Sequence, residues 1–117
     1  MHGEEELPLV DGNTTMADAL LVMTAKRFGC AGIVDGAGRL EGIVTDGDLR
    51  RHMSPELLAR KTAEVMSRDP QTIGSHALAS EAVRTMNAHS VTNLFVVDGG
   101  PPIGILHIHD CLRAGVA

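Results

Sequence analysis

Aromatic residues are nearly absent from this 117-residue sequence, which has two phenylalanines, Phe28 and Phe95, and no tryptophan or tyrosine. Proteins commonly hold a flat ring by stacking it on an aromatic side chain. Any flat ring that this protein binds is therefore expected to lie between aliphatic side chains.

Positive charge is also scarce. The sequence has 10 Lys and Arg residues against 15 Asp and Glu residues, which gives a net charge of −5 at pH 7. This balance argues against a nucleic-acid partner, because binding a phosphate backbone requires a basic face. It does not exclude a small anion, since a binding site depends on local charge, and Arg50, Arg51 and His52 are adjacent.

Long apolar runs and closely spaced cysteines are missing as well. No run approaches the roughly 18 apolar residues of a membrane-spanning helix, and the acidic residues 4–6 are unlike the basic start of a signal peptide. We therefore expect a cytoplasmic protein without a membrane partner. Cys30 and Cys111 lack metal-type spacing and are predicted to be small buried hydrophobes in a reducing compartment.

The sequence does contain an internal repeat with an offset of about 62 or 63 residues. Val34-Asp35-Gly36 recurs as Val97-Asp98-Gly99, and Asp48 recurs as Asp110. Each copy is predicted to form an extended strand, a helix, two strands joined by a turn, and a short helix. We expect an α/β fold in which two β-α-β-β-α repeats, each with a three-stranded sheet flanked by helices, pack with pseudo-twofold symmetry.

The predicted elements follow from apolar spacing, turn residues and capping residues. In the first copy they cover residues 7–10, 16–28, 30–34, 40–44 and 46–53, and in the second copy residues 71–73, 78–88, 93–97, 103–106 and 109–113. The connector 54–61 is predicted to form a short helix, with Ser54 as its cap and Pro55 at its first position. The first repeat with its connector thus covers residues 1–61 and the second repeat covers residues 62–117.

The most informative stretch is residues 42–51, where a predicted strand leads directly into a helix. Thr45 is the expected N-cap, and Thr45 with Asp48 has the spacing of a capping box, which needs no ligand. An anion is also favoured at such a helix start. In the second copy Asp110 recurs but the cap position holds His107, a poorer N-cap. This favours a further role for the carboxylates, such as accepting hydrogen bonds from ribose hydroxyls.

Arginines and histidines near these carboxylates have more than one interpretation. Arg51, whose counterpart is Arg113, is favoured over Arg50 as a ligand for a phosphate or carboxylate, although solvated helix residues are the common alternative. His107 and His109 would share one face of a strand, which suggests a metal site. Without a third clear ligand, hydrogen bonding to an anion or hydroxyl is favoured over a metal, and structural histidines are the other alternative.

With residues 42–48 closing the first copy and residues 104–110 closing the second, the chain resembles a tandem CBS-domain pair (Bateman module) along its whole length. More narrowly, residues 45–51 and 107–116 resemble the C-terminal regulatory region of bacterial arabinose 5-phosphate isomerases, which supply a precursor of Kdo in lipopolysaccharide. The resemblance implies a regulatory fragment, not an enzyme, that lacks the catalytic sugar-isomerase (SIS) domain of the full-length protein. It also implies a homodimer of CBS pairs.

The same resemblance implies a nucleotide or nucleotide-sugar ligand in the cleft between the repeats, with CMP-Kdo an attractive choice, and no required cofactor. Ala31-Gly32 and Thr92-Asn93 are expected to precede the second strand of each copy and to face this cleft. The candidate ligand-binding residues are Ala31, Gly32, Thr45, Asp46, Asp48, Arg51, Thr72, Thr92, Asn93, His107, His109 and Asp110.

Two other functions remain open at the level of sequence. The chain could be a structural dimerisation module that uses the helices 16–28 and 78–88 and has no physiological ligand. It could be an enzyme only if the fold brought Asp46, Asp48, His107 and His109 together, because no nucleophile stands beside a base at motif spacing. No catalytic residue and no metal ligand is therefore assigned.

Overall fold

The computed structural model describes residues 7–26 and 28–113, which form two compact units. One unit is Pro8–Pro70, and the other runs from Gln71 onward and includes Leu7. The first unit thus includes residues 62–70, which the repeat offset places at the start of the second copy. In the described ranges no helix has the length and apolar character needed to span a membrane.

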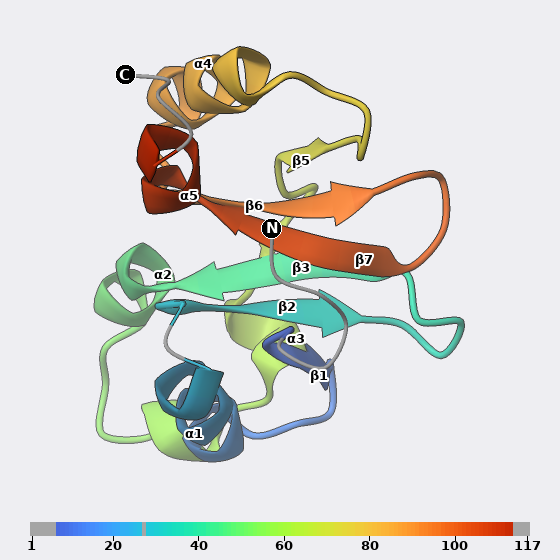
Figure 1. Ribbon diagram of the computed structural model, residues 1–117. Helices are drawn as coiled ribbons and strands as arrows, with labels where there is room; N and C mark the ends of the chain where they lie inside the picture. Colours follow the sequence, from blue (N-terminus) through green and yellow to red (C-terminus); the bar gives the residue numbers. More distant parts are fainter. Residues whose placement is uncertain (1–6, 27, 114–117) are drawn as a thin grey trace. The chain divides into compact units, whose positions relative to one another are not determined.

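The first unit is a mixed sheet flanked by helices (Figure 1). Its elements are β1 (Leu9–Asp11), α1 (Met16–Lys26), β2 (Cys30–Val34), β3 (Leu40–Thr45), α2 (Asp46–Arg51), the 3-10 helix η2 (Leu57–Ala59), α3 (Thr62–Val65) and β4 (Ser67–Arg68). The strand order is β1-β2-β3-β4, with β1 parallel to β2 and the other pairs antiparallel. The two-residue strand β4 adds a fourth strand to the three predicted ones.

Local hydrogen bonds explain why the predicted helix and turn form in this unit. The Asp18 amide donates to Thr15 Oγ1 at 3.3 Å, so Thr15 caps α1. In the turn between β2 and β3, Asp35 Oδ1 accepts hydrogen bonds from the amides of Ala37 and Arg39, both at 2.9 Å. Gly38 has a φ of 82° in the same turn, a conformation that favours glycine.

The connector differs from its prediction. The short helix begins at Leu57 and not at Pro55, because the Leu57 amide donates to the Ser54 carbonyl and makes residues 54–57 a turn with proline at its second position. Helix α3 was not predicted. Its first residue, Thr62, is fully buried and donates through Oγ1 to the Asp11 carbonyl at 2.7 Å, which fixes α3 to the end of β1.

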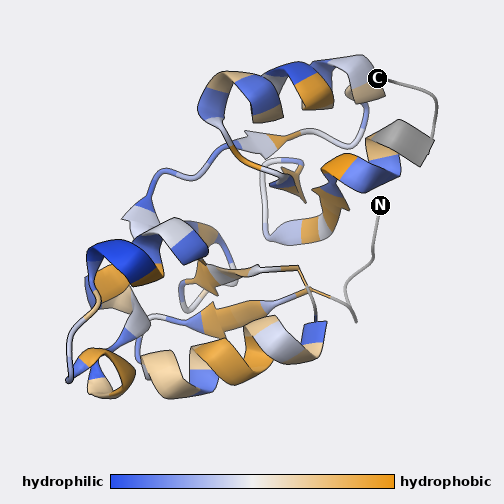
Figure 2. Ribbon diagram, turned by 90° about the vertical axis from the view of Figure 1, so that its left-hand side faces the viewer, coloured by the Kyte–Doolittle hydropathy of each residue, from blue (hydrophilic) through white to orange (hydrophobic). Residues whose placement is uncertain are grey.

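The core of the first unit lies between its sheet and helices α1, η2 and α3. Its buried members are Met16, Met23, Ala31, Ile33, Val44, Leu57, Val65 and Met66. Figure 2 shows that much of the ribbon of α1, at the bottom of the view, has the colours of apolar residues. Leu21 on this helix is 68% exposed, so α1 has apolar side chains on both its buried and its solvent-facing sides.

The second unit repeats the plan. Its elements are β5 (Thr72–Ile73), α4 (Ala79–His89), β6 (Asn93–Val97), β7 (Pro102–His107) and α5 (Ile108–Arg113). The strand order is β5-β6-β7, with β5 parallel to β6, and α4 packs beside α5 (Figure 1). The register shifts between Ile33 and Val34 in the first hairpin and between Val96 and Val97 in the second. The shared bulge confirms that the sequence repeat is a structural repeat.

Candidate functional site

The predicted cap at the start of α2 is present. Thr45 ends β3 with extended φ and ψ of −125° and 175°, and α2 begins at the next residue. Asp48 Oδ2 accepts hydrogen bonds from the Thr45 amide at 2.9 Å and from Thr45 Oγ1 at 3.2 Å. The carboxylate therefore holds the turn from β3 into α2, as a capping residue does.

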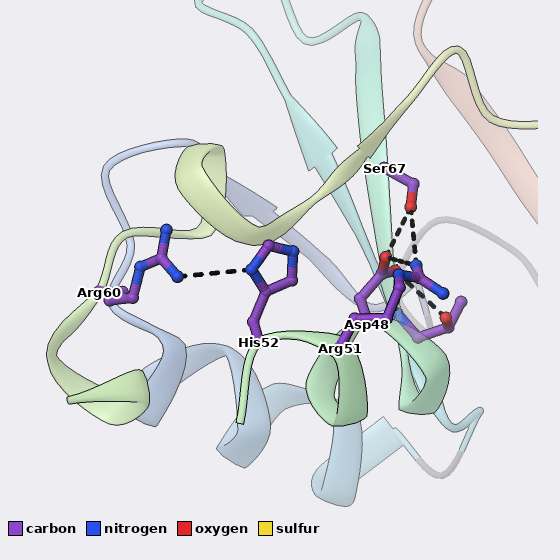
Figure 3. Close-up of polar contacts among 6 residues, drawn as sticks. Asp48, Arg51, His52, Arg60 and Ser67 are labelled. Atoms are coloured by element: carbon purple, nitrogen blue, oxygen red, sulfur yellow. Dashed lines mark hydrogen bonds and ion pairs between the residues drawn. The ribbon is translucent and has the colours of Figure 1, made fainter. Parts of the chain in front are cut away.

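The second oxygen of the same carboxylate binds two further groups (Figure 3). Ser67 Oγ, on β4, donates to Asp48 Oδ1 at 2.6 Å, and the Arg51 guanidinium forms an ion pair with it. Asp48 is only 1% exposed. Because an ionised carboxylate offers about four acceptor positions, this buried group is fully engaged by its own chain.

Arg51 differs from the carboxylate that it binds, because its side chain is 61% exposed. Besides Asp48 it contacts Ser67 Oγ at 3.4 Å. Its neighbours Asp46 and Arg50 are exposed, and His52 takes part in a separate contact with Arg60 (Figure 3). Of the predicted site residues of the first unit, the structure thus brings Thr45, Asp48 and Arg51 together and adds Ser67, which the sequence analysis missed.

The second unit uses the same arrangement with a histidine in place of threonine. Asp110 Oδ2 accepts a hydrogen bond from the His107 amide at 2.9 Å, and His107 Nδ1 accepts one from the His109 amide at 3.0 Å. His107 therefore caps α5 with its ring nitrogen. His107 is a poorer N-cap than threonine by residue type, yet it caps α5 here, because its imidazole nitrogen takes the place of the threonine oxygen as acceptor. The recurrence of Asp110 therefore does not by itself require a role beyond capping.

The two histidines are arranged differently from the prediction. His107 ends β7 while His109 lies in α5, so they are not alternate residues of one strand. Their rings are nevertheless stacked, with centroids 4.7 Å apart and planes at 18°. Within residues 7–26 and 28–111, whose side chains are described, no group of three or more His, Cys, Asp or Glu side chains is placed to hold a metal ion.

Replacing His107 with alanine tests its role as a cap. We expect His107→Ala to lower the free energy of unfolding by about 1 kcal/mol, the usual cost of losing an N-cap. His107→Thr, which copies Thr45 of the first unit, should stay within about 0.5 kcal/mol of the wild type. Urea unfolding followed by far-UV circular dichroism measures both, and equal stabilities for the alanine variant and the wild type would show that the ring does not cap α5.

Ala31, Gly32 and Asn93 lie on strands. Ala31 and Gly32 are buried inside β2, opposite Val44 and Ile43, and Asn93 begins β6 opposite His107. These residues therefore lie within the predicted strands 30–34 and 93–97 and do not precede the second strand of each copy, because the strand pairing extends through them.

Two threonines complete the candidate residues of the second unit. Thr92 lies just before β6, and its carbonyl accepts a hydrogen bond from the Ile108 amide at 2.8 Å. Thr72 on β5 pairs with Phe95 and is separated from β7 by a strand, so it is not placed beside His107. The Arg113 side chain and residues 114–116, which carry part of the predicted resemblance, lie outside what the structure describes.

The two thiols have no reactive surroundings. Cys30 and Cys111 are free and buried, as predicted. Burial, with a smaller contribution from the nearby Asp46 carboxylate, raises the pKa of Cys30 to about 12. Burial likewise raises the pKa of Cys111. A thiol that stays protonated is a poor nucleophile and metal ligand.

Comparison with known proteins agrees with the two-repeat organisation described above. The CBS domain family matches the chain twice, over residues 4–55 and 63–117. The chain is 42% identical over 118 residues to arabinose 5-phosphate isomerase KdsD of Yersinia pestis and 40% identical to KdsD of Escherichia coli K12. These alignments cover 99% of the chain but only 36% of each isomerase.

Among solved structures, the fold is similar to that of CBSX2 in complex with AMP, with a TM-score of 0.83 and 24% identity over 98% of this chain and 91% of that one. CBSX2 comes from Arabidopsis thaliana. At this identity the likeness shows the fold alone, and it confirms the predicted α/β architecture of two small mixed sheets flanked by helices.

Proposed function

The chain belongs to the CBS-domain family, and on that premise we propose that it is a ligand-sensing regulatory pair that controls an arabinose 5-phosphate isomerase domain. The observation that carries the proposal is the identity of 40–42% to the KdsD isomerases along 99% of this chain. The chain spans 36% of their length, so the isomerase domain would be the SIS domain in the rest of a full-length protein.

The proposed ligand is a nucleotide or a nucleotide-sugar such as CMP-Kdo. One solved relative of this fold, CBSX2, is described in complex with AMP. In the first unit, Asp48 would accept hydrogen bonds from ribose hydroxyls, and the exposed guanidinium of Arg51 would bind a phosphate or carboxylate. Thr45 and Asp46 would complete this site at the start of α2.

The second unit would contribute its own anchors. There Asp110 would be the hydroxyl acceptor and the stacked His107 and His109 would contact the acidic part of the ligand. The base would meet the backbone and side chains on or next to the strands of both units, at Ala31, Gly32, Thr72, Thr92 and Asn93.

Regulation would follow from a shift in population. A ligand can favour one conformation of a protein only to the extent that it binds that conformation more tightly. A ligand that contacts both repeats would favour the arrangement in which both sets of contacts form. The attached isomerase domain would then respond to occupancy.

Isothermal titration of the 117-residue chain with CMP-Kdo, CMP, AMP and ATP tests the proposal. At least one of these ligands should bind, and Arg51→Ala should weaken its binding by roughly 10-fold or more, as expected when a charge-assisted hydrogen bond is lost. Arg50→Ala is the matched control, because Arg50 is the adjacent exposed arginine. If none of the four ligands gives heat or a thermal shift with a folded chain, the sensor is refuted.

A structural dimerisation module is the second candidate, and two exposed leucines favour it. Leu21 on α1 is 68% exposed and Leu78 at the start of α4 is 65% exposed, and these are the helices named above for such a module. In a full-length protein, Arg51→Ala would shift the response to roughly 10-fold or more higher ligand concentration and keep the dimer if the chain is a sensor. It would change neither property if the chain only joins subunits.

A further inference from the structure

The Asp48 carboxylate has no acceptor position left for a ligand. Thr45 occupies Oδ2 with two hydrogen bonds, and Ser67 and Arg51 occupy Oδ1. A carboxylate accepts about four hydrogen bonds. A ligand hydroxyl can therefore reach Asp48 only by replacing one of these partners.

Ser67 is the partner that can be replaced most readily. Thr45 is three residues from Asp48 and is held beside it by the turn into α2, whereas Ser67 is 19 residues away in sequence. Ser67 lies on β4, a strand of two residues that pairs only with Gly42 and Ile43 among the described residues. Its hydroxyl donates to the same kind of acceptor position that a sugar hydroxyl would use.

The segment that Ser67 fixes joins the two units. Pro70 is the last residue of the first unit and Gln71 begins the second. Between β4 and this boundary, Asp69 has a φ of 53°, a left-handed conformation that residues other than glycine adopt infrequently. Ser67 joins this two-residue strand to Asp48 and Arg51 of α2, and a residue in the left-handed region follows it. Such a segment is a suitable hinge.

We propose that Asp48 exchanges partners when ligand binds: Ser67 occupies Oδ1 in the free protein, and a hydroxyl of a ribose-type vicinal diol replaces it in the complex. This exchange rests on the proposed function, because it concerns the same ligand. It removes the hydrogen bond from β4 to Asp48, which leaves only the longer 3.4 Å contact of Ser67 Oγ to Arg51 between these side chains, and so communicates occupancy to the segment between the units. Arg51 stays available to the anionic group of the ligand, since most of its side chain faces solvent.

Titrating AMP and CMP into Ser67→Ala tests the exchange. Without the competing hydroxyl, the variant should bind whichever probe the wild type binds about 3–10-fold more tightly, the factor that corresponds to one hydrogen bond between protein groups. Ser54→Ala removes an exposed serine hydroxyl elsewhere in the same unit and should bind like the wild type.

The other outcomes refute the exchange. Equal or weaker binding by Ser67→Ala would leave the sensor intact but show that Ser67 does not compete with ligand. If neither probe binds the wild type or the variant, the proposed function fails for these nucleotides and the exchange fails with it.

Hydrogen exchange of the wild type gives a second measurement that needs no variant. Saturating AMP or CMP should speed amide exchange in the peptide containing residues 67–70 by roughly 3–10-fold, because Ser67 of β4 loses its hydrogen bond to Asp48. Unchanged or slower exchange there, with binding shown by titration, would overturn the proposal even if Ser67→Ala did not fold.

Discussion

Asp48→Ala is expected to lower the free energy of unfolding by about 3 kcal/mol. The substitution removes the acceptor of four contacts at a position that is 1% exposed. It leaves the Thr45 amide and the Ser67 hydroxyl without their partner, and a buried donor without an acceptor costs more than the hydrogen bond itself contributed. Urea unfolding followed by far-UV circular dichroism is the appropriate measurement.

Two variants calibrate this result. Asp46→Ala removes an exposed carboxylate from the same first turn of α2 and should change stability by no more than about 0.5 kcal/mol. Asp48→Asn keeps the shape but has one acceptor oxygen instead of two, so its stability should fall between those of the wild type and Asp48→Ala. A loss below about 1 kcal/mol in Asp48→Ala would contradict the central place of this carboxylate in the first unit.

Gly42→Ala should be destabilising by about 2–3 kcal/mol. A Cβ atom at this position would lie 2.6 Å from Met66 Sδ and 2.8 Å from the Ser67 carbonyl oxygen. The methionine side chain can move, but the carbonyl belongs to the backbone of β4, so the added methyl group must displace the strand that pairs with Gly42. The loss should appear in the same unfolding experiment.

Gly36→Ala provides the control for this glycine. A Cβ atom there would meet nothing within 4 Å, and the residue is exposed in the turn between β2 and β3. Its stability should stay within about 0.5 kcal/mol of the wild type. If the two variants are equally stable, β4 does not pack against β3 as closely as the structure indicates.

The local features of the fold were predictable from sequence. Residues 30–34 and 93–97 were predicted as strands and form β2 and β6 with the same bounds. The capping role of Thr45 followed from a hydroxyl placed between an apolar strand and a pair of carboxylates. These features depend on contacts within a few residues, which spacing and residue type describe well.

The features that the sequence analysis missed depend on distant contacts. Helix α3 is fixed by Thr62 to Asp11, 51 residues away, and β4 has only two residues, too few to show strand periodicity. Ser67 lies 19 residues from Asp48. Nothing in the residues around Ser67 indicates that its hydroxyl contacts this carboxylate. The capping role of His107 was not expected, because N-cap preferences rank residue types on average. They do not show that the ring nitrogen of this histidine accepts a hydrogen bond from the His109 amide.

The contact between Thr62 and Asp11 has a consequence for the order in which the chain folds on the ribosome. The contact joins Asp11, at the end of β1, to Thr62, which lies near the C-terminal end of the same unit. Strand β4 comes later still, at Ser67–Arg68. Translation proceeds from the N-terminus, and domains generally fold as units during synthesis. The first unit can therefore reach its complete hydrogen-bonded state only after residues 62–68 have left the exit tunnel, by which time synthesis of the second unit has begun.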